Sequence, residues 1–204
     1  MKQYFEFVKR NIVQNDLYFL FNSKYRRFKQ FKEEFIPLYY FSQSKYCKTD
    51  MKMQIIIGNQ PYDALIQEKD GTINKFEFTL YEDGKFENYD AKLLEERGYG
   101  SLRFKDNVNF EDRENDYFHQ IMKNIIKKSK TDYTDVNIII CANTFYYFEV
   151  FNKSSKPFVD RLIKEIRKIK FTAKSVYLMV YNKDPISKIT KNIYLVMYGQ
   201  SNCT

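Results

Sequence analysis

Residues 63 to 84 read DALIQEKDGTINKFEFTLYEDG, and the alternation of apolar and polar side chains in this stretch predicts a β-hairpin. The turn falls at Asp70-Gly71, a residue pair typical of tight hairpin turns. The first strand carries Asp63 and the second carries Glu77. Two carboxylates on neighbouring strands can hold a hard divalent cation through their oxygens, so the hairpin is a candidate site for Mg²⁺ or Mn²⁺.

The register of the hairpin decides whether the two acids meet. A three-residue turn over residues 69–71 would place Asp63 opposite Glu77, with both side chains on one face of the sheet. A two-residue turn at Asp70-Gly71 would place Asp63 opposite Phe78, so that the acids would point to opposite faces unless a bulge corrected them. The sequence allows both registers. Two ordinary solvated acids on a surface hairpin are the alternative to a metal site.

The segments on either side of the hairpin predict an α/β fold. Apolar runs of strand length cover residues 54–57, 63–67, 73–81, 136–142, 175–181 and 192–198. Apolar residues spaced at three and four predict helices over residues 2–21 and 25–38, a short helix over 89–97, a helix capped by Asn115 and a last helix from Ser155. Three strands in a meander, followed by strands alternating with helices, predict a mixed β-sheet flanked by helices.

The chain of 204 residues is expected to form a single domain. Its parts would be N-terminal helices in residues 1–50 and an α/β core over 51–200, with a charged insertion at 98–114. The run 136–142 is apolar throughout, which is typical of a strand covered on both faces.

Composition excludes several functional classes. The three cysteines are far apart and form no CxxC motif, which argues against a disulfide scaffold and a zinc site. His119 is the single histidine, and no nucleophile elbow accompanies it, so we expect it on a helix surface and not in a Ser-His-Asp mechanism. No apolar run is long enough to span a membrane and no signal peptide is recognisable, so we expect a cytoplasmic protein without a membrane partner.

The formal net charge of +8 favours a polyanionic partner. Nucleic acid is the expected partner, with DNA and RNA both open, and a homodimer is left open as well. Lysines at 123 and 127 line up with His119 on one side of the predicted helix, where a solvated helix face is the simpler interpretation.

In order and spacing, these elements resemble the core of the PD-(D/E)xK, or restriction-endonuclease-like, superfamily. The resemblance covers roughly residues 54–181 and rests on the strand 54–57, Pro61-Tyr62-Asp63, Lys75-Phe76-Glu77-Phe78-Thr79, the helix ending Lys127-Lys128-Ser129-Lys130 and the strand 136–141. It implies a restriction-endonuclease-like core with an N-terminal helical extension. It also implies that Asp63 and Glu77 bind Mg²⁺ or Mn²⁺ and that the protein is a metal-dependent endonuclease.

Thr79 stands where the resemblance would place a lysine that orients the attacking water and offsets charge in the transition state. A relocated lysine could replace it, either Lys75 on the same strand or Lys123 or Lys127 on the following helix. Alternatively, the site works without a lysine, or it has lost catalysis and kept only binding. An additional acid from the helix before the sheet, Glu33 or Glu34, would fit the superfamily's occasional extra ligand.

The leading functional hypothesis is therefore a divalent-metal-dependent nuclease, or a catalytically degenerate relative, with Asp63, Glu77, Thr79, Lys75 and Lys127 at its site. A non-enzymatic nucleic-acid-binding module is the first alternative. A protein-interaction role, of the immunity or assembly type, is the second.

Overall fold

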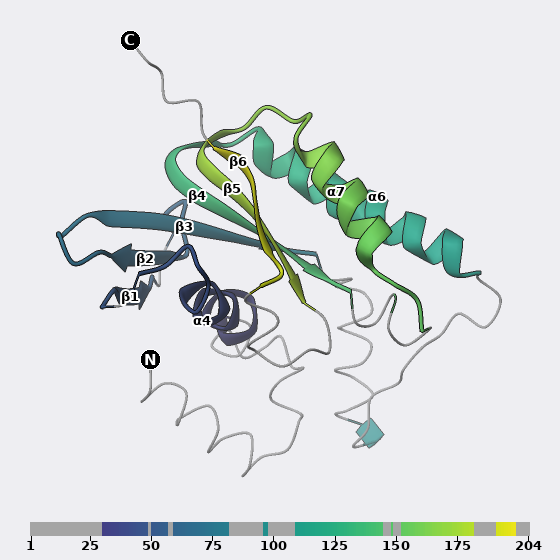
Figure 1. Ribbon diagram of the computed structural model, residues 1–204, viewed down its shortest axis with the longest axis horizontal. Coiled ribbons are helices and arrows are strands. Elements are labelled where there is room, and N and C mark those ends of the chain that lie inside the picture. Colours follow the sequence, from purple (N-terminus) through teal and green to yellow (C-terminus); the bar gives the residue numbers. More distant parts are fainter. Residues whose placement is uncertain are drawn as a thin grey trace.

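One mixed β-sheet organises the described part of the chain (Figure 1). The computed structural model describes residues 30–48, 50–56, 59–81, 96–97, 109–144, 148, 152–181 and 191–198. The strands are β1 (Lys52–Ile55), β2 (Ala64–Gln67), β3 (Ile73–Leu80), β4 (Asp132–Asn143), β5 (Thr172–Tyr181) and β6 (Ile193–Tyr198). Their order in the sheet follows their order in the chain. β1, β2 and β3 form an antiparallel meander, β3, β4 and β5 run parallel, and β6 is antiparallel to β5.

Helices cover both faces of this sheet. The described helices are the π-helical turn η1 (Phe31–Phe35), α4 (Ile36–Ser42), α6 (Phe110–Ser129) and α7 (Lys156–Ile166). Figure 1 shows α6 and α7 together on one side of the sheet and α4 on the other. Parallel neighbouring strands need a crossover connection, and α6 and α7 supply it between β3 and β4 and between β4 and β5. The expected α/β class, with a mixed sheet flanked by helices, is confirmed.

The core has two apolar layers separated by the sheet. Because strand side chains alternate, Ile138 and Ile140 of β4 pack in the layer beneath α6 and α7. Ile139 and Cys141 pack in the opposite layer with Leu38 of α4. The apolar run in this strand is therefore buried from both sides, as its sequence predicted.

The start of α6 corrects the expected helix boundary. The helix begins at Phe110 with Asn109 as N-cap, and not at Asn115. The Asn109 side-chain oxygen accepts a hydrogen bond from the Asp112 backbone N–H at 2.8 Å. The acids in this first turn favour the positive end of the helix dipole, so their charge supports a helix where we expected a charged loop. The loop expected at 98–114 is thus wrong over 110–114, and residues 98–108 lie outside the described residues.

Other predicted helices are described only in part. The helix expected over residues 2–21 lies outside the described residues, and of the short helix over 89–97 only Glu96 and Arg97 are described, both helical. Two residues of the predicted apolar stripe over 25–38, Phe35 and Leu38, are buried as expected.

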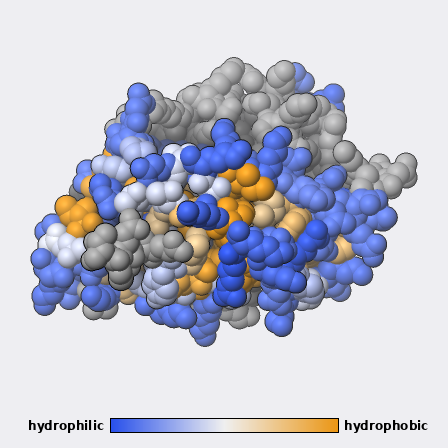
Figure 2. All heavy atoms as spheres, turned by 90° about the horizontal axis from the view of Figure 1, so that it is seen from above, coloured by the Kyte–Doolittle hydropathy of each residue, from blue (hydrophilic) through white to orange (hydrophobic). Residues whose placement is uncertain are grey.

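On the face shown in Figure 2, hydrophilic residues make up most of the described surface. Among the helices that the structure describes, none combines the length and the apolar character needed to cross a membrane.

Candidate functional site

The turn of the β2–β3 hairpin contains three residues. The Gly71 N–H donates to the Glu68 carbonyl at 3.0 Å, and the Glu68 N–H donates to the Thr72 carbonyl at 2.8 Å. Residues 69–71 therefore form the turn, which is the first of the two registers that the sequence allows. Gly71 has φ +89°, a conformation that a residue with a Cβ atom adopts at a cost.

This register brings Asp63 to Glu77 at the edge of β3. Ala64 pairs with Phe76 as the last ladder pair of β2 and β3, so Asp63 is the next residue outward. The regular strand pairing ends there: the Asp63 N–H donates a hydrogen bond at 2.8 Å to the carbonyl of Phe76, the residue that pairs with Ala64. The Asp63 carboxylate turns around the strand edge and accepts a hydrogen bond from the Phe78 N–H at 2.8 Å. The negative charge of Asp63 lies close enough to Glu77 to raise the pKa of the Glu77 carboxyl.

Both carboxyls are harder to ionise than usual. Burial raises the pKa of Asp63, although the Phe78 N–H and the Lys128 charge act in the opposite direction. Burial, and next to it the negative charge of Asp63, raise the pKa of Glu77 to about 7. The Glu77 residue is only 7% exposed, so little water reaches its carboxylate. Such a pair gains from any cation that can enter between the two groups.

Lys128 of α6 supplies one positive charge at this point. Its ammonium forms an ion pair with Glu77 and donates a second, longer hydrogen bond to the Tyr133 hydroxyl at 3.4 Å. Burial lowers the pKa of Lys128, but the hydrogen bond to Glu77 and the Glu77 charge outweigh it, so the net shift is upward. Lys128 therefore stays charged and holds Glu77 in place.

A third acid approaches from η1. Burial raises the pKa of Glu34 to about 7; a hydrogen bond from Gln30 opposes this, and the charge of Asp63 adds to it. The Glu34 Oε2 atom is buried and has no hydrogen-bond partner among the described residues. The sequence offered Glu33 or Glu34 as an additional ligand, and both side chains line the same cavity as Asp63 and Glu77.

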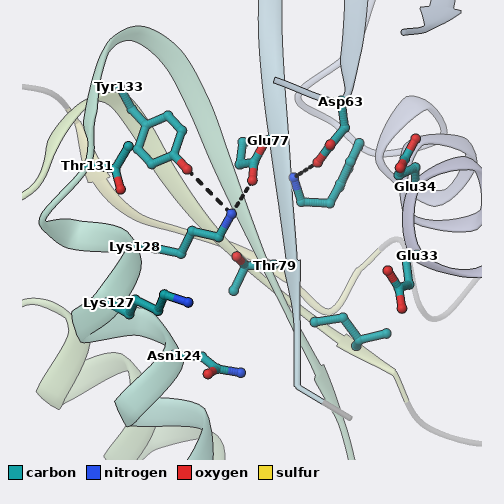
Figure 3. A pocket seen from close by; sticks show the side chains of 12 residues that line it. Glu33, Glu34, Asp63, Glu77, Thr79, Asn124, Lys127, Lys128, Thr131 and Tyr133 are labelled. Atoms are coloured by element: carbon teal, nitrogen blue, oxygen red, sulfur yellow. Dashed lines mark hydrogen bonds and ion pairs between the residues drawn. The ribbon is translucent and has the colours of Figure 1, made fainter. Parts of the chain in front are cut away.

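These groups line one cavity of about 440 Å³. Its walls come from η1, the residue before β2, the outer half of β3, the last turns of α6 and the start of β4. Figure 3 shows Asp63 and the two η1 acids, Glu33 and Glu34, on one side of β3. The α6 side chains Lys127 and Lys128 lie on the other side. Asp63 and the η1 acids thus lie on one side of β3, whereas Lys127 and Lys128 lie on the other side together with Glu77.

The other predicted site residues divide into two groups. Thr79 and Lys127 line the cavity. Lys75 does not line it, and its ammonium lies 5.6 Å from the centre of the Tyr62 ring instead. Lys123 is exposed on α6 outside the cavity lining, and His119 is exposed on the same helix, as expected.

Sequence reasoning missed Lys128 and Tyr133. Lys128 follows Ile125 by three residues and therefore continues the buried stripe that Ile121 and Ile125 begin. A lysine at the end of an apolar stripe was the available signal, because its side chain must face the sheet. Tyr133 is buried at the start of β4 and carried no comparable signal.

The acids do not form a larger metal cluster. Within the described ranges, no set of three or more His, Cys, Asp or Glu side chains is arranged to hold a metal ion. Asp63 and Glu77 are thus a carboxylate pair, with Glu34 nearby. No family model, curated protein or solved structure matches this chain.

Proposed function

We propose that the protein is a divalent-metal-dependent nuclease acting on nucleic acid phosphodiesters. The observation that carries the proposal is the proximity of two carboxyls, the half-buried Asp63 and the buried Glu77, beside the Lys128 ammonium in an accessible cavity. Two carboxylates held this close repel one another unless a proton or a cation lies between them. Burial raises the pKa values of both carboxyls, and the negative charge of Asp63 adds to the rise for Glu77.

The donor set fits Mg²⁺ or Mn²⁺. Mg²⁺ usually binds through one or two carboxylates and completes its shell with water and substrate phosphate oxygens, so a pair of acids is sufficient. Asp63 and Glu77 would hold the ion, and Glu34 would add negative charge from η1. When bound, such an ion polarises a phosphoryl oxygen and lowers the pKa of a coordinated water.

The chain's own residues position and balance the acids. The Phe78 N–H fixes one oxygen of Asp63, and Lys128 fixes Glu77. Lys128 also brings a positive charge to the side of β3 where Thr79 carries none. We therefore assign to Lys128 the role of the catalytic lysine, for which the sequence suggested Lys75, Lys123 or Lys127. A fixed ammonium can offset negative charge that develops on a phosphoryl group, without reorganising during the reaction.

The order of elements supports a restriction-endonuclease-like core. A helix, an antiparallel meander of three strands, a crossover helix and a fourth strand parallel to the third follow one another in the chain. This is the order on which the sequence resemblance rests. Glu77 lies on the third strand, on the side of the crossover helix, and Asp63 lies on the opposite side of that strand.

The test is cleavage of single- and double-stranded DNA and RNA in Mg²⁺ or Mn²⁺. We expect Glu77→Gln, Asp63→Asn and Lys128→Met each to lower the cleavage rate by about 100-fold or more, because each removes a charge from the site. Glu68→Gln is the matched control, since Glu68 lies on the same hairpin and pairs with Lys48 outside the cavity. Cleavage that persists unchanged in Glu77→Gln would remove Glu77 from the mechanism.

A second candidate is a nucleic-acid-binding module without cleavage. The ion pair between Lys128 and Glu77 favours it, because a lysine can neutralise that carboxylate in place of a metal ion. This candidate predicts oligonucleotide binding that needs no divalent cation, and no cleavage in either metal.

A further inference from the structure

Thr79 carries a buried hydroxyl without a partner. The residue is 7% exposed, and its Oγ1 atom has no hydrogen-bond partner among the described residues. A buried hydroxyl without a hydrogen bond destabilises a fold, and valine would fill the same space on a strand at lower cost. Thr79 also lines the cavity, so the hydroxyl is placed where a ligand can reach it.

Two donors of α6 lie on the same wall. Asn124 and Lys127 are three residues apart, which places them on one side of the helix, and both line the cavity. Figure 3 shows both side chains extending from α6 toward β3 and Thr79. Neither has a hydrogen-bond or ion-pair partner within the described part of the chain, whereas neighbouring Lys128 is held by Glu77 and Tyr133.

A hydroxyl, an amide and an ammonium can together donate several hydrogen bonds to one oxyanion. Charge-assisted hydrogen bonds to phosphate oxygens are stronger than neutral ones, and lysine serves as a point charge in many phosphate sites. The acids of η1 lie across β3 from these donors, so the two sides of the cavity differ in the charge they attract.

We propose that Thr79, Asn124 and Lys127 form an oxyanion subsite that binds a phosphate group of the substrate. The proposal rests on the proposed function for the identity of that substrate, a nucleic acid. It assigns Thr79 a binding role in place of the charge that a lysine would bring. It also places the phosphate oxygens on the α6 side of β3, next to Glu77, with Asp63 across the strand.

The test measures the binding of inorganic phosphate to the full chain in the absence of divalent metal. Phosphorus NMR at about pH 6 detects the bound phosphate. We expect Thr79→Val and Lys127→Met each to weaken phosphate binding by about tenfold, the size of one hydrogen bond to a charged group.

Two matched variants control the test. Thr79→Ser keeps the hydroxyl and should keep binding close to that of the wild type. Lys123→Met removes a lysine from the same helix outside the cavity, and we expect it to change the affinity by less than about twofold. Thr79→Val should also unfold at a higher temperature than the wild type, which separates a lost ligand contact from a damaged fold.

The subsite is overturned if the protein does not bind phosphate. It is also overturned if Thr79→Val and Lys127→Met bind phosphate with the same affinity as the wild type. Because the measurement uses no metal, it does not depend on cleavage. Phosphate binding that follows the variants in a protein without nuclease activity supports the subsite and removes the proposed function. Nuclease activity in a protein whose variants keep their phosphate affinity supports the proposed function and removes the subsite.

Discussion

At the scale of single residues, the site is a set of acids whose charges are costly where they lie. Glu34 and Glu77 both have pKa values raised to about 7, chiefly by burial. Lys128 compensates Glu77, whereas Glu34 has only the Gln30 hydrogen bond to lower its pKa. The most direct measure of the site's electrostatics is therefore the effect of Glu34 on folding.

We expect Glu34→Gln to stabilise the protein at high pH. The pKa of about 7 in the folded protein lies above the ordinary 4.5, so folding takes up a proton between these values. The wild type then loses stability as pH rises from about 4.5 to about 7, and the full penalty is present above that range. Because Glu34 is half-buried and partly screened by solvent, we expect a gain of about 1 kcal/mol in the free energy of unfolding near pH 8.

Urea unfolding at pH 4 and at pH 8 measures this gain. At pH 4 the Glu34 carboxyl is protonated in both folded and unfolded chains, so the difference between variant and wild type should nearly vanish. Asp116→Asn, which removes an exposed acid from α6, controls for the change in net charge. A stability difference that is the same at both pH values would contradict the shifted pKa.

At the scale of elements, the β2–β3 hairpin and α6 bring the site together. The three-residue turn sets the register that carries Asp63 to Glu77, and α6 then places Lys128 over Glu77. The hairpin depends on the positive φ angle of Gly71, and α6 depends on Asn109 as its N-cap.

Gly71→Ala should destabilise the protein by about 1 kcal/mol, because an L-residue with a Cβ atom is disfavoured at φ +89°. An added Cβ would meet no atom within 4 Å, so the cost comes from the backbone alone. Asn adopts positive φ more readily, and Gly71→Asn should recover most of the loss. Thermal unfolding of the two variants measures the difference, and equal loss in both would show that the space at the turn matters more than its φ angle.

Asn109→Ala should cost about 1 kcal/mol, because it removes the hydrogen bond that caps α6. Asn115→Ala removes only an exposed hydrogen bond from Arg161 at 2.8 Å and should cost less than about 0.5 kcal/mol. Urea unfolding of both variants decides between the two helix boundaries. A larger loss at Asn115 would restore the boundary that we expected from the sequence.

At the scale of the whole molecule, a chain with a net charge of +8 holds a cavity that is lined by several acids. Under the proposed function, the net positive charge would attract a polyanion, and Lys127 and Lys128 would offset the acids when a phosphate enters the cavity. This combination suits a substrate that must approach carboxylates despite its own negative charge.

If nucleic acid is the partner, binding should weaken steeply with salt. Each phosphate neutralised by Lys or Arg releases counterions, so a contact of even a few phosphates lowers affinity by more than about tenfold between roughly 50 mM and 200 mM salt. Fluorescence anisotropy of a labelled oligonucleotide, with the Glu77→Gln variant to prevent cleavage, measures the slope. Affinity that is independent of salt would contradict a phosphate-backbone contact.

Within the described residues, the sequence by itself determined the type and order of the strands, because the period of a strand is a local property. The alternation in residues 73–81 and the apolar run 136–142 predict β3 and β4 without knowledge of their neighbours. Asp63 and Glu77 were recognisable as candidates because both lie in the one predicted hairpin, which is also a local feature. The restriction-endonuclease-like core, the metal and the nuclease activity stay predictions.

Only the tertiary structure decided which residues meet. Glu34, Asp63, Glu77 and Lys128 come from four segments of the chain, and no local period relates them. One position along α6 turns a side chain by about 100°, so Lys127 and Lys128 face different parts of the cavity although they are adjacent in sequence. Packing of α6 against β3 selected Lys128 for Glu77 and left Lys127 toward Thr79, a choice that depends on the position of the whole helix on the sheet.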